Sequence, residues 1–217
     1  MDIGYDSRIK SDVFAKVVAG VFAANGVKVN IWPALMPVPT VSLATHYLHT
    51  SACVMVTASR NPSKYNGYKV YGADGCQIAT EAAAEILAEI EKLDTFADVK
   101  TGDFETGVEN GSIQYIPDEV HTAFVEQVKS QSVLFGEEVN KDVAIIYSPL
   151  NGTGLKPVTR TPEGDGLHQH YCGQRAGAAG WEIPDLPVSQ HGNQRSDGTW
   201  HRVCQEVQRR SAAGNRP

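Results

Sequence analysis

Segments with the pattern of β-strands alternate with segments with the pattern of α-helices along the first 161 residues. The clearest strand is the unbroken apolar run ACVMVTAS at residues 52–59, which is typical of a strand that is covered on both faces. Strands that alternate with helices indicate an α/β sheet layered with helices and joined by right-handed crossovers. We therefore predict an α/β fold with a mixed or parallel sheet, followed by an irregular tail.

The remaining elements follow from apolar periodicity and from turn residues. Ser11 is expected to cap the first helix and Gly26 to end it. Residues 94–116 are expected to form a polar connection. The expected strands cover residues 2–6, 27–32, 52–59, 68–72 and 143–149, and the expected helices cover residues 11–26, 39–50, 76–93 and 117–131.

Charge and hydropathy narrow the possible classes of function. The net charge of −6 argues against a nucleic-acid-binding protein, although a few local cations are enough to bind a phosphate. Apolar runs fall short of the roughly 18–20 residues that cross a bilayer, so we expect no membrane partner. The first residues lack the pattern of a secretory signal, and the four cysteines lack CxxC spacing. We therefore expect a cytoplasmic protein with reduced thiols. The oligomeric state is not indicated.

One loop carries groups suited to phosphate chemistry. The run Thr57-Ala58-Ser59-Arg60-Asn61-Pro62 leaves the carboxyl end of the expected buried strand, where open α/β sheets place their ligands. A serine in such a loop can present its hydroxyl to a cleft, and Lys69 follows close enough to hold a phosphate. On spacing alone, a plain turn explains the pattern equally well.

The sequence TASRNPSKYNGYKVYGADGCQI at residues 57–78 resembles the active-site loop of the α-D-phosphohexomutases, which reads TASHNP followed by NGxK. The resemblance implies that Ser59 is phosphorylated and that Lys69 contacts the transferring phosphate. Arg8, in GYDSR, matches an arginine that approaches this site in the family. By the same resemblance, Arg60 is expected to be a catalytic residue, and Asn61 and Asn66 are expected to bind substrate or phosphate.

The resemblance implies a phosphoglucomutase or phosphomannomutase that binds a small-molecule sugar phosphate. Phosphoserine gives its phosphate to the sugar monophosphate, and the other phosphate of the resulting bisphosphate returns to the serine. The family uses Mg²⁺, held by one phosphoserine oxygen, here on Ser59, and by three aspartates of a DxDxDR loop, since hard cations prefer oxygen ligands. The preference between glucose and mannose is not indicated.

The chain departs from the family pattern at two points. Arg60 stands where the family has histidine, and a permanently charged guanidinium cannot exchange a proton near neutral pH. A DxDxDR run does not occur in the chain. We therefore expect the chain to be inactive by itself. A non-catalytic phosphosugar-binding module is the alternative, and a small hydrolase using Ser59 is less favoured because no Asp/His pair has the context of a triad.

The composition changes after Thr161. All ten lysines precede this point, and residues 162–217 contain only six Leu, Ile or Val. Such a segment has too few apolar side chains for a core. Read one base out of frame with suitable third bases, the tail gives a family-like sequence that ends in LLLATDP. We predict a partial domain I at residues 1–116, the start of domain II at 117–161, and an out-of-frame, irregular tail at 162–217.

Overall fold

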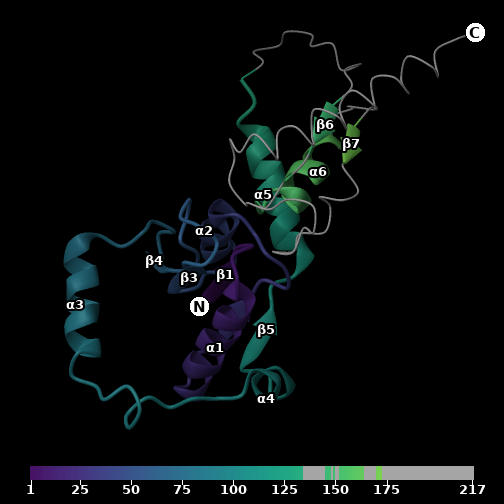
Figure 1. Ribbon diagram of the computed structural model, residues 1–217. Coiled ribbons are helices and arrows are strands. Elements are labelled where there is room, and N and C mark those ends of the chain that lie inside the picture. The colour runs from purple at the N-terminus through teal and green to yellow at the C-terminus, as the bar shows by residue number, and fades with distance from the viewer. Residues whose placement is uncertain (134–144, 148, 150–151, 164–169, 173–217) are drawn as a thin grey trace, which may run out of the picture. The chain divides into compact units, whose positions relative to one another are not determined.

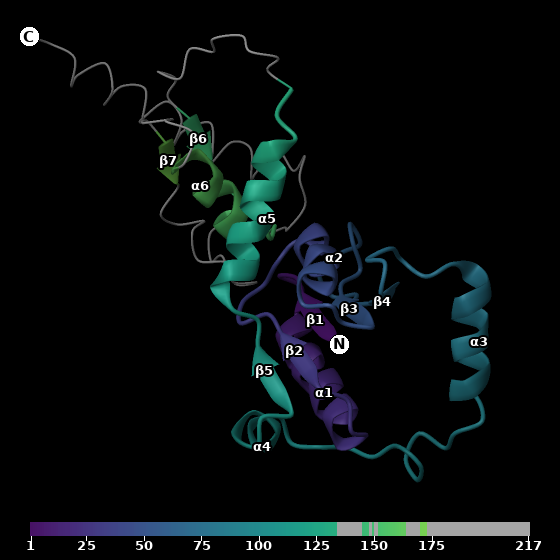
Figure 2. The same cartoon turned by 180° about the vertical axis from the view of Figure 1, so that it is seen from behind.

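The structure is a computed structural model that describes residues 1–133, 145–147, 149, 152–163 and 170–172. By packing, the chain divides into two compact units. The first consists of Met1–Ser59 and Lys64–Gln131, and the second of Arg60–Ser63 and the chain from Ser132 onward. Figures 1 and 2 show the elements from opposite sides.

The first unit is built on a mixed five-stranded sheet with the strand order β4-β3-β1-β2-β5. β1 pairs in parallel with β2 and β3, and β2 pairs in parallel with β5. β4 is antiparallel to β3, and the two edge strands are therefore β4 and β5. The predicted α/β fold with a mixed sheet is confirmed. The strands are β1 (Asp2–Tyr5), β2 (Val29–Ile31), β3 (Ala52–Val56), β4 (Tyr68–Gly72) and β5 (Ile113–Tyr115).

Apolar cores lie on both faces of this sheet. Successive side chains of a strand point to opposite faces, so Val54 and Val56 of β3 join one core while Cys53 and Met55 join the other. α1 and α4 contribute to the first core, and α2 and α5 to the second. This arrangement explains why the β3 segment is apolar without alternation. The helices are α1 (Ser11–Ala24), α2 (Val38–Tyr47), α3 (Thr80–Ile90), α4 (Phe104–Glu109) and α5 (Asp118–Ser130).

The two ends of α1 differ in how well the sequence predicts them. Gly26 ends the helix as expected: its φ is +80°, and its backbone nitrogen donates to the carbonyl of Ala23 at 3.0 Å. The prediction that Ser11 caps the helix is wrong, because Lys10 holds the cap position with φ 62°. Ser11 is instead the first helical residue, and its hydroxyl donates to Asp6 Oδ1 at 2.9 Å.

The expected polar connection at residues 94–116 contains two elements that the sequence did not indicate. α4 begins after Asp103, whose Oδ2 accepts from the backbone nitrogen of Thr106 at 2.8 Å. β5 follows and pairs with β2. Only Ile113 of its three residues is buried, so the period-two pattern is too short to detect.

The described part of the second unit contains β6 (Ile145–Tyr147), α6 (Leu155–Glu163) and β7 (His170–Cys172). β6 and β7 pair in parallel. The predicted boundaries at residues 116 and 161 remain predictions. The irregular tail also remains a prediction, because residues 164–169 and 173–217 lie outside the described residues. The three-residue strand β7 does not contradict this prediction, since an irregular tail can contain short elements. Among the described helices, none is long and apolar enough to span a membrane.

Candidate functional site

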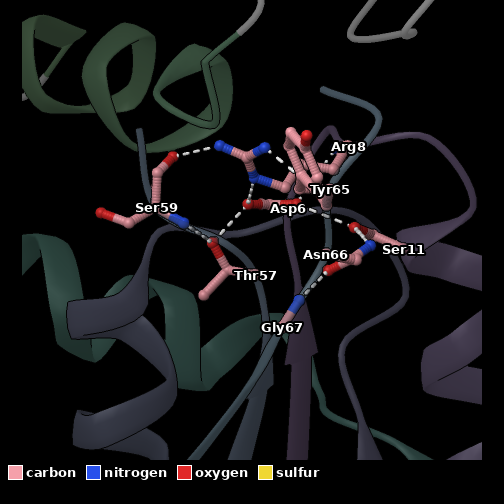
Figure 3. A network of polar contacts seen from close by, with 8 residues as sticks. All are labelled: Asp6, Arg8, Ser11, Thr57, Ser59, Tyr65, Asn66 and Gly67. Atoms are coloured by element: carbon pink, nitrogen blue, oxygen red, sulfur yellow. Dashed lines mark hydrogen bonds and ion pairs between the residues drawn. The ribbon is translucent and has the colours of Figure 1, made fainter. Parts of the chain in front are cut away.

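Two neighbouring parallel strands bring the predicted site residues together. β1 and β3 pair so that Tyr5 lies opposite Val56. The segment after β1 carries Asp6 and Arg8, and the segment after β3 carries Thr57 and Ser59, so both segments leave the same edge of the sheet. Figure 3 shows the resulting polar network. The prediction that Ser59 lies just beyond a buried strand is confirmed, since Cys53–Val56 are at most 2% exposed and Ser59 is exposed.

Asp6 is the hub of this network. Its Oδ1 accepts from the Ser11 hydroxyl at 2.9 Å and from the backbone nitrogen of Arg8 at 3.0 Å. Its Oδ2 accepts from the Thr57 hydroxyl and lies 3.3 Å from Nε of Arg8. Both carboxylate oxygens are therefore occupied by contacts within the protein.

Arg8 connects the segment after β1 to the serine loop. The side chain is 8% exposed, and Nε lies against Asp6. Nη2 donates to the backbone carbonyl of Ser59, and Nη1 donates to that of Tyr65 at 3.2 Å. A planar guanidinium can reach several acceptors in fixed directions, which a lysine ammonium cannot reproduce. The structure thus brings Arg8 to Ser59, as expected, and shows it holding both ends of the loop.

Ser59 has a left-handed backbone conformation with φ 56°. For a residue other than glycine, this conformation costs about 1 kcal/mol or more, so neighbouring contacts must compensate. The backbone nitrogen of Ser59 donates to Thr57 Oγ1 at 3.0 Å, and its carbonyl accepts from Arg8. The Ser59 hydroxyl points away from Arg8 and Thr57 (Figure 3) and makes no hydrogen bond with the described residues.

Asn66 and Gly67 hold the far end of the loop against β3. The backbone nitrogen of Thr57 donates to the Gly67 carbonyl at 3.0 Å. A Cβ at position 67 would lie 2.6 Å from the carbonyl oxygen of Thr57, so this approach requires glycine. The amide of Asn66 donates to the Ser11 hydroxyl at 2.8 Å and accepts from the backbone nitrogen of Gly67. Asn66 therefore supports the loop, and its predicted contact with substrate or phosphate remains a prediction.

Among the described contacts, the side chains of the other predicted site residues take no part in this network. Lys69 is half-buried on β4 opposite Met55, and within the described residues its side chain makes no hydrogen bond or ion pair. Arg60 and Asn61 are exposed and belong by packing to the second unit. The roles predicted for these three residues remain predictions.

The sequence-based predictions missed Asp6, Thr57 and Ser11. Asp6 lies two residues before Arg8, and Thr57 two residues before Ser59, so both lie within the segments that contain predicted site residues. The sequence feature that could have identified Asp6 and Thr57 is a polar side chain directly after the end of a strand. Its importance becomes visible only when β1 and β3 are known to be neighbours.

Comparison with known families identifies the fold that carries this network. The family described as Phosphoglucomutase/phosphomannomutase, alpha/beta/alpha domain I matches residues 2–97. The chain carries domain I of the phosphoglucomutase/phosphomannomutase family. Ser59 and the network around it lie within the matched part of the chain.

Individual relatives agree with this assignment. The phosphoglucomutase of Staphylococcus saprophyticus is 36% identical over 157 residues, which are 72% of this chain and 28% of the relative. A protein of Schizosaccharomyces pombe named "Probable phosphoribomutase" is 38% identical over 162 residues, with 72% of this chain and 27% of that protein covered. The chain therefore spans less than a third of the length of these relatives.

A solved structure shows the same likeness. A crystal structure from Thermus thermophilus, described as a phosphomannomutase, superposes with a TM-score of 0.65 at 25% sequence identity. The superposition covers 81% of this chain and 37% of the other. The layered arrangement of the mixed sheet is thus that of phosphohexomutase domain I.

Enzymes of this family generally depend on Mg²⁺, a cation that prefers several oxygen ligands. The described residues contain no group of three or more His, Cys, Asp or Glu side chains that could hold a metal ion. Asp6, the carboxylate at the serine loop, has both oxygens engaged by Ser11, Thr57 and Arg8. The described residues therefore do not supply the carboxylate ligands of a magnesium site by themselves, and the ligand predicted on Ser59, an oxygen of its phosphate, remains a prediction.

Proposed function

We propose that this chain supplies the phosphoserine domain of a cytoplasmic phosphohexomutase, an isomerase that interconverts hexose 1-phosphate and hexose 6-phosphate. Ser59 carries the phosphate, and the reaction passes through a hexose bisphosphate. The chain by itself is inactive. The observation that supports this proposal is the state of Ser59, whose backbone is held on both sides while its exposed hydroxyl is free of hydrogen bonds with the described residues.

In this reaction the phosphoryl group leaves Ser59 Oγ for a free hydroxyl of the sugar phosphate, and the proton of that hydroxyl ends on the serine oxygen. Charge spreads over the phosphoryl oxygens during transfer, so catalysis depends on position and on nearby cations. We assign the positioning of the loop to Arg8 and the phosphate contact to Lys69. Arg60 adds a positive charge there but cannot exchange a proton.

The proposed substrate is a phosphate of glucose or of mannose, without a preference between the two sugars. The names of the relatives include a phosphoglucomutase and a phosphoribomutase, and the similar structure is described as a phosphomannomutase. The matched part of the chain is the shared domain I. We therefore expect this domain to carry the phosphate chemistry that these proteins have in common.

A chimera tests the proposal. The segment of the Staphylococcus saprophyticus phosphoglucomutase that matches this chain is replaced by the corresponding residues of this chain. We expect conversion of glucose 1-phosphate to glucose 6-phosphate, and phosphate on Ser59 by mass spectrometry. Ser59→Ala should abolish both, whereas Ser51→Ala, at an exposed serine before β3, should leave them unchanged. A folded chimera that is no more active than its Ser59→Ala variant would sink the proposal.

The second candidate is a phosphosugar-binding module without catalysis. The arginine at position 60 favours it, because a fixed cation suits phosphate binding better than proton transfer. Isothermal titration of the chain with glucose 1-phosphate distinguishes the two. The module predicts saturable binding that weakens in Arg60→Ala, together with an inactive chimera.

A further inference from the structure

We propose that Asp6 and Thr57 are positioning residues that hold Ser59 in its left-handed conformation and thereby aim its hydroxyl out of the loop. This inference rests on the proposed function, because it assigns the two residues a task in phosphate exchange at Ser59. Neither side chain needs to touch the substrate. Both act through the backbone of the serine.

The hydrogen bonds of Thr57 run in one direction. A carboxylate can only accept hydrogen bonds, so the Thr57 hydroxyl is the donor in its hydrogen bond with Asp6 Oδ2. The hydroxyl oxygen then presents a lone pair to the backbone nitrogen of Ser59, at 3.0 Å. Thr57 is 4% exposed, which shields both bonds from competition with water. Asp6 thus fixes the orientation of the group that holds the Ser59 nitrogen.

Asp6 holds the other side of Ser59 through Arg8. Its Oδ2 lies 3.3 Å from Nε of Arg8, and its Oδ1 accepts from the Arg8 backbone nitrogen at 3.0 Å. These contacts fix the guanidinium that donates to the Ser59 carbonyl. A single carboxylate therefore controls both backbone groups of Ser59, through Thr57 on one side and Arg8 on the other.

The backbone of Ser59 is held by hydrogen bonds on both sides, whereas its side chain takes no part in them. The contacts with Thr57 and Arg8 use the backbone nitrogen and carbonyl of Ser59, and the hydroxyl makes no hydrogen bond with the described residues. A hydroxyl that extends from a fixed backbone and makes no hydrogen bond of its own can exchange a phosphate without first losing a partner. Preorganisation of this kind lowers the entropy cost of reaching the reacting geometry.

Two spectroscopic measurements on the full chain test the inference without requiring catalysis. The first is hydrogen exchange at the Ser59 amide by NMR. The second is the position of the ³¹P resonance in a chain synthesised with phosphoserine at position 59. Thr57→Val removes the hydroxyl at similar shape, and Thr57→Ser retains it. Thr45→Val makes the same change at a buried threonine of α2 whose hydroxyl bonds to the Val41 carbonyl of its own helix and to the Cys53 thiol, and not to the serine loop.

We expect Thr57→Val to speed exchange of the Ser59 amide roughly tenfold, in line with the loss of one hydrogen bond. It should also move the ³¹P resonance toward its position in the urea-unfolded chain. Thr57→Ser and Thr45→Val should retain the values of the unchanged chain. If Thr57→Val does not fold, Asp6→Asn replaces it, since an amide cannot accept all four contacts of the carboxylate, and it should shift both signals in the same direction.

Unchanged exchange and an unchanged ³¹P resonance in folded Thr57→Val would overturn the proposal, and so would equal shifts in Thr45→Val. These outcomes do not depend on whether Ser59 takes part in turnover. An inactive chimera with an intact Ser59 amide signature would instead count against the proposed function alone.

Discussion

The guanidinium of Arg8 donates to the backbone carbonyl of Ser59, a residue 51 positions further along the chain. This contact joins the ends of two parallel strands and holds the left-handed serine in place. Its consequences for stability and chemistry can be measured separately, because the Ser59 hydroxyl is not part of it.

Arg8→Lys is expected to destabilise the first unit. A lysine ammonium cannot reach Asp6 and the carbonyls of Ser59 and Tyr65 together, so partly buried acceptors lose their donors. The loss should be about 1–3 kcal/mol in the free energy of unfolding, measured with urea. Lys92→Met, which removes an exposed pair with Glu89, should cost less than about 1 kcal/mol. Equal effects of the two changes would contradict this account of Arg8.

Ser59→Gly should be more stable than Ser59→Ala by roughly 1 kcal/mol, because glycine adopts a positive φ without steric cost. Thermal unfolding of the two variants gives the difference. As a control, Ser51→Gly should be no more stable than Ser51→Ala, because φ at Ser51 is not positive. A Ser59→Gly variant that is less stable than Ser59→Ala would mean that the left-handed conformation is not retained.

Cys53 and Cys76 should differ in thiol reactivity. Burial raises the pKa of the Cys53 thiol, partly offset by a hydrogen bond with Thr45, and the side chain is fully buried, whereas Cys76 is exposed. Iodoacetamide near pH 8 should therefore modify Cys76 first, as peptide mapping by mass spectrometry would show. Because the unfolded chain ionises Cys53 at lower pH than the folded chain, this group should reduce stability as pH rises above about 8.5. Comparable labelling of both thiols in the folded chain would refute the buried placement.

Arg60→His should raise kcat in the chimera if the proposed function holds. Histidine restores a group that can exchange a proton near neutral pH, and general acid–base catalysis of this kind contributes about a hundredfold or more to the rate. The increase in kcat should depend on pH near the ordinary pKa of a histidine side chain, about 6.5. Arg60→Gln, which is neutral without a titrating group, serves as the control. The same kcat in both variants would show that proton exchange at position 60 does not limit turnover.

The sequence predicted best the features that depend on a single element. The β3 strand was recognisable because both of its faces are buried, and Ser59 because its loop resembles a family motif. α4 and β5 were missed because they have only six and three residues, which is too short for a periodic pattern, and only one side chain of β5 is buried. The contacts of Asp6 with Thr57 were missed for a different reason. They arise from the pairing of Tyr5 with Val56, which local patterns do not encode.

α3 is an amphipathic helix, yet none of its residues is buried. In both views its ribbon lies away from the sheet (Figures 1 and 2). Ile86, Leu87 and Ile90 are each more than 40% exposed. Helices shorter than roughly 12–15 residues are only marginally populated in water unless a packed face supports them. The helix–coil equilibrium of this 11-residue segment is therefore set almost entirely by its own sequence, and its circular dichroism signal should melt gradually and independently of the cooperative transition of the sheet.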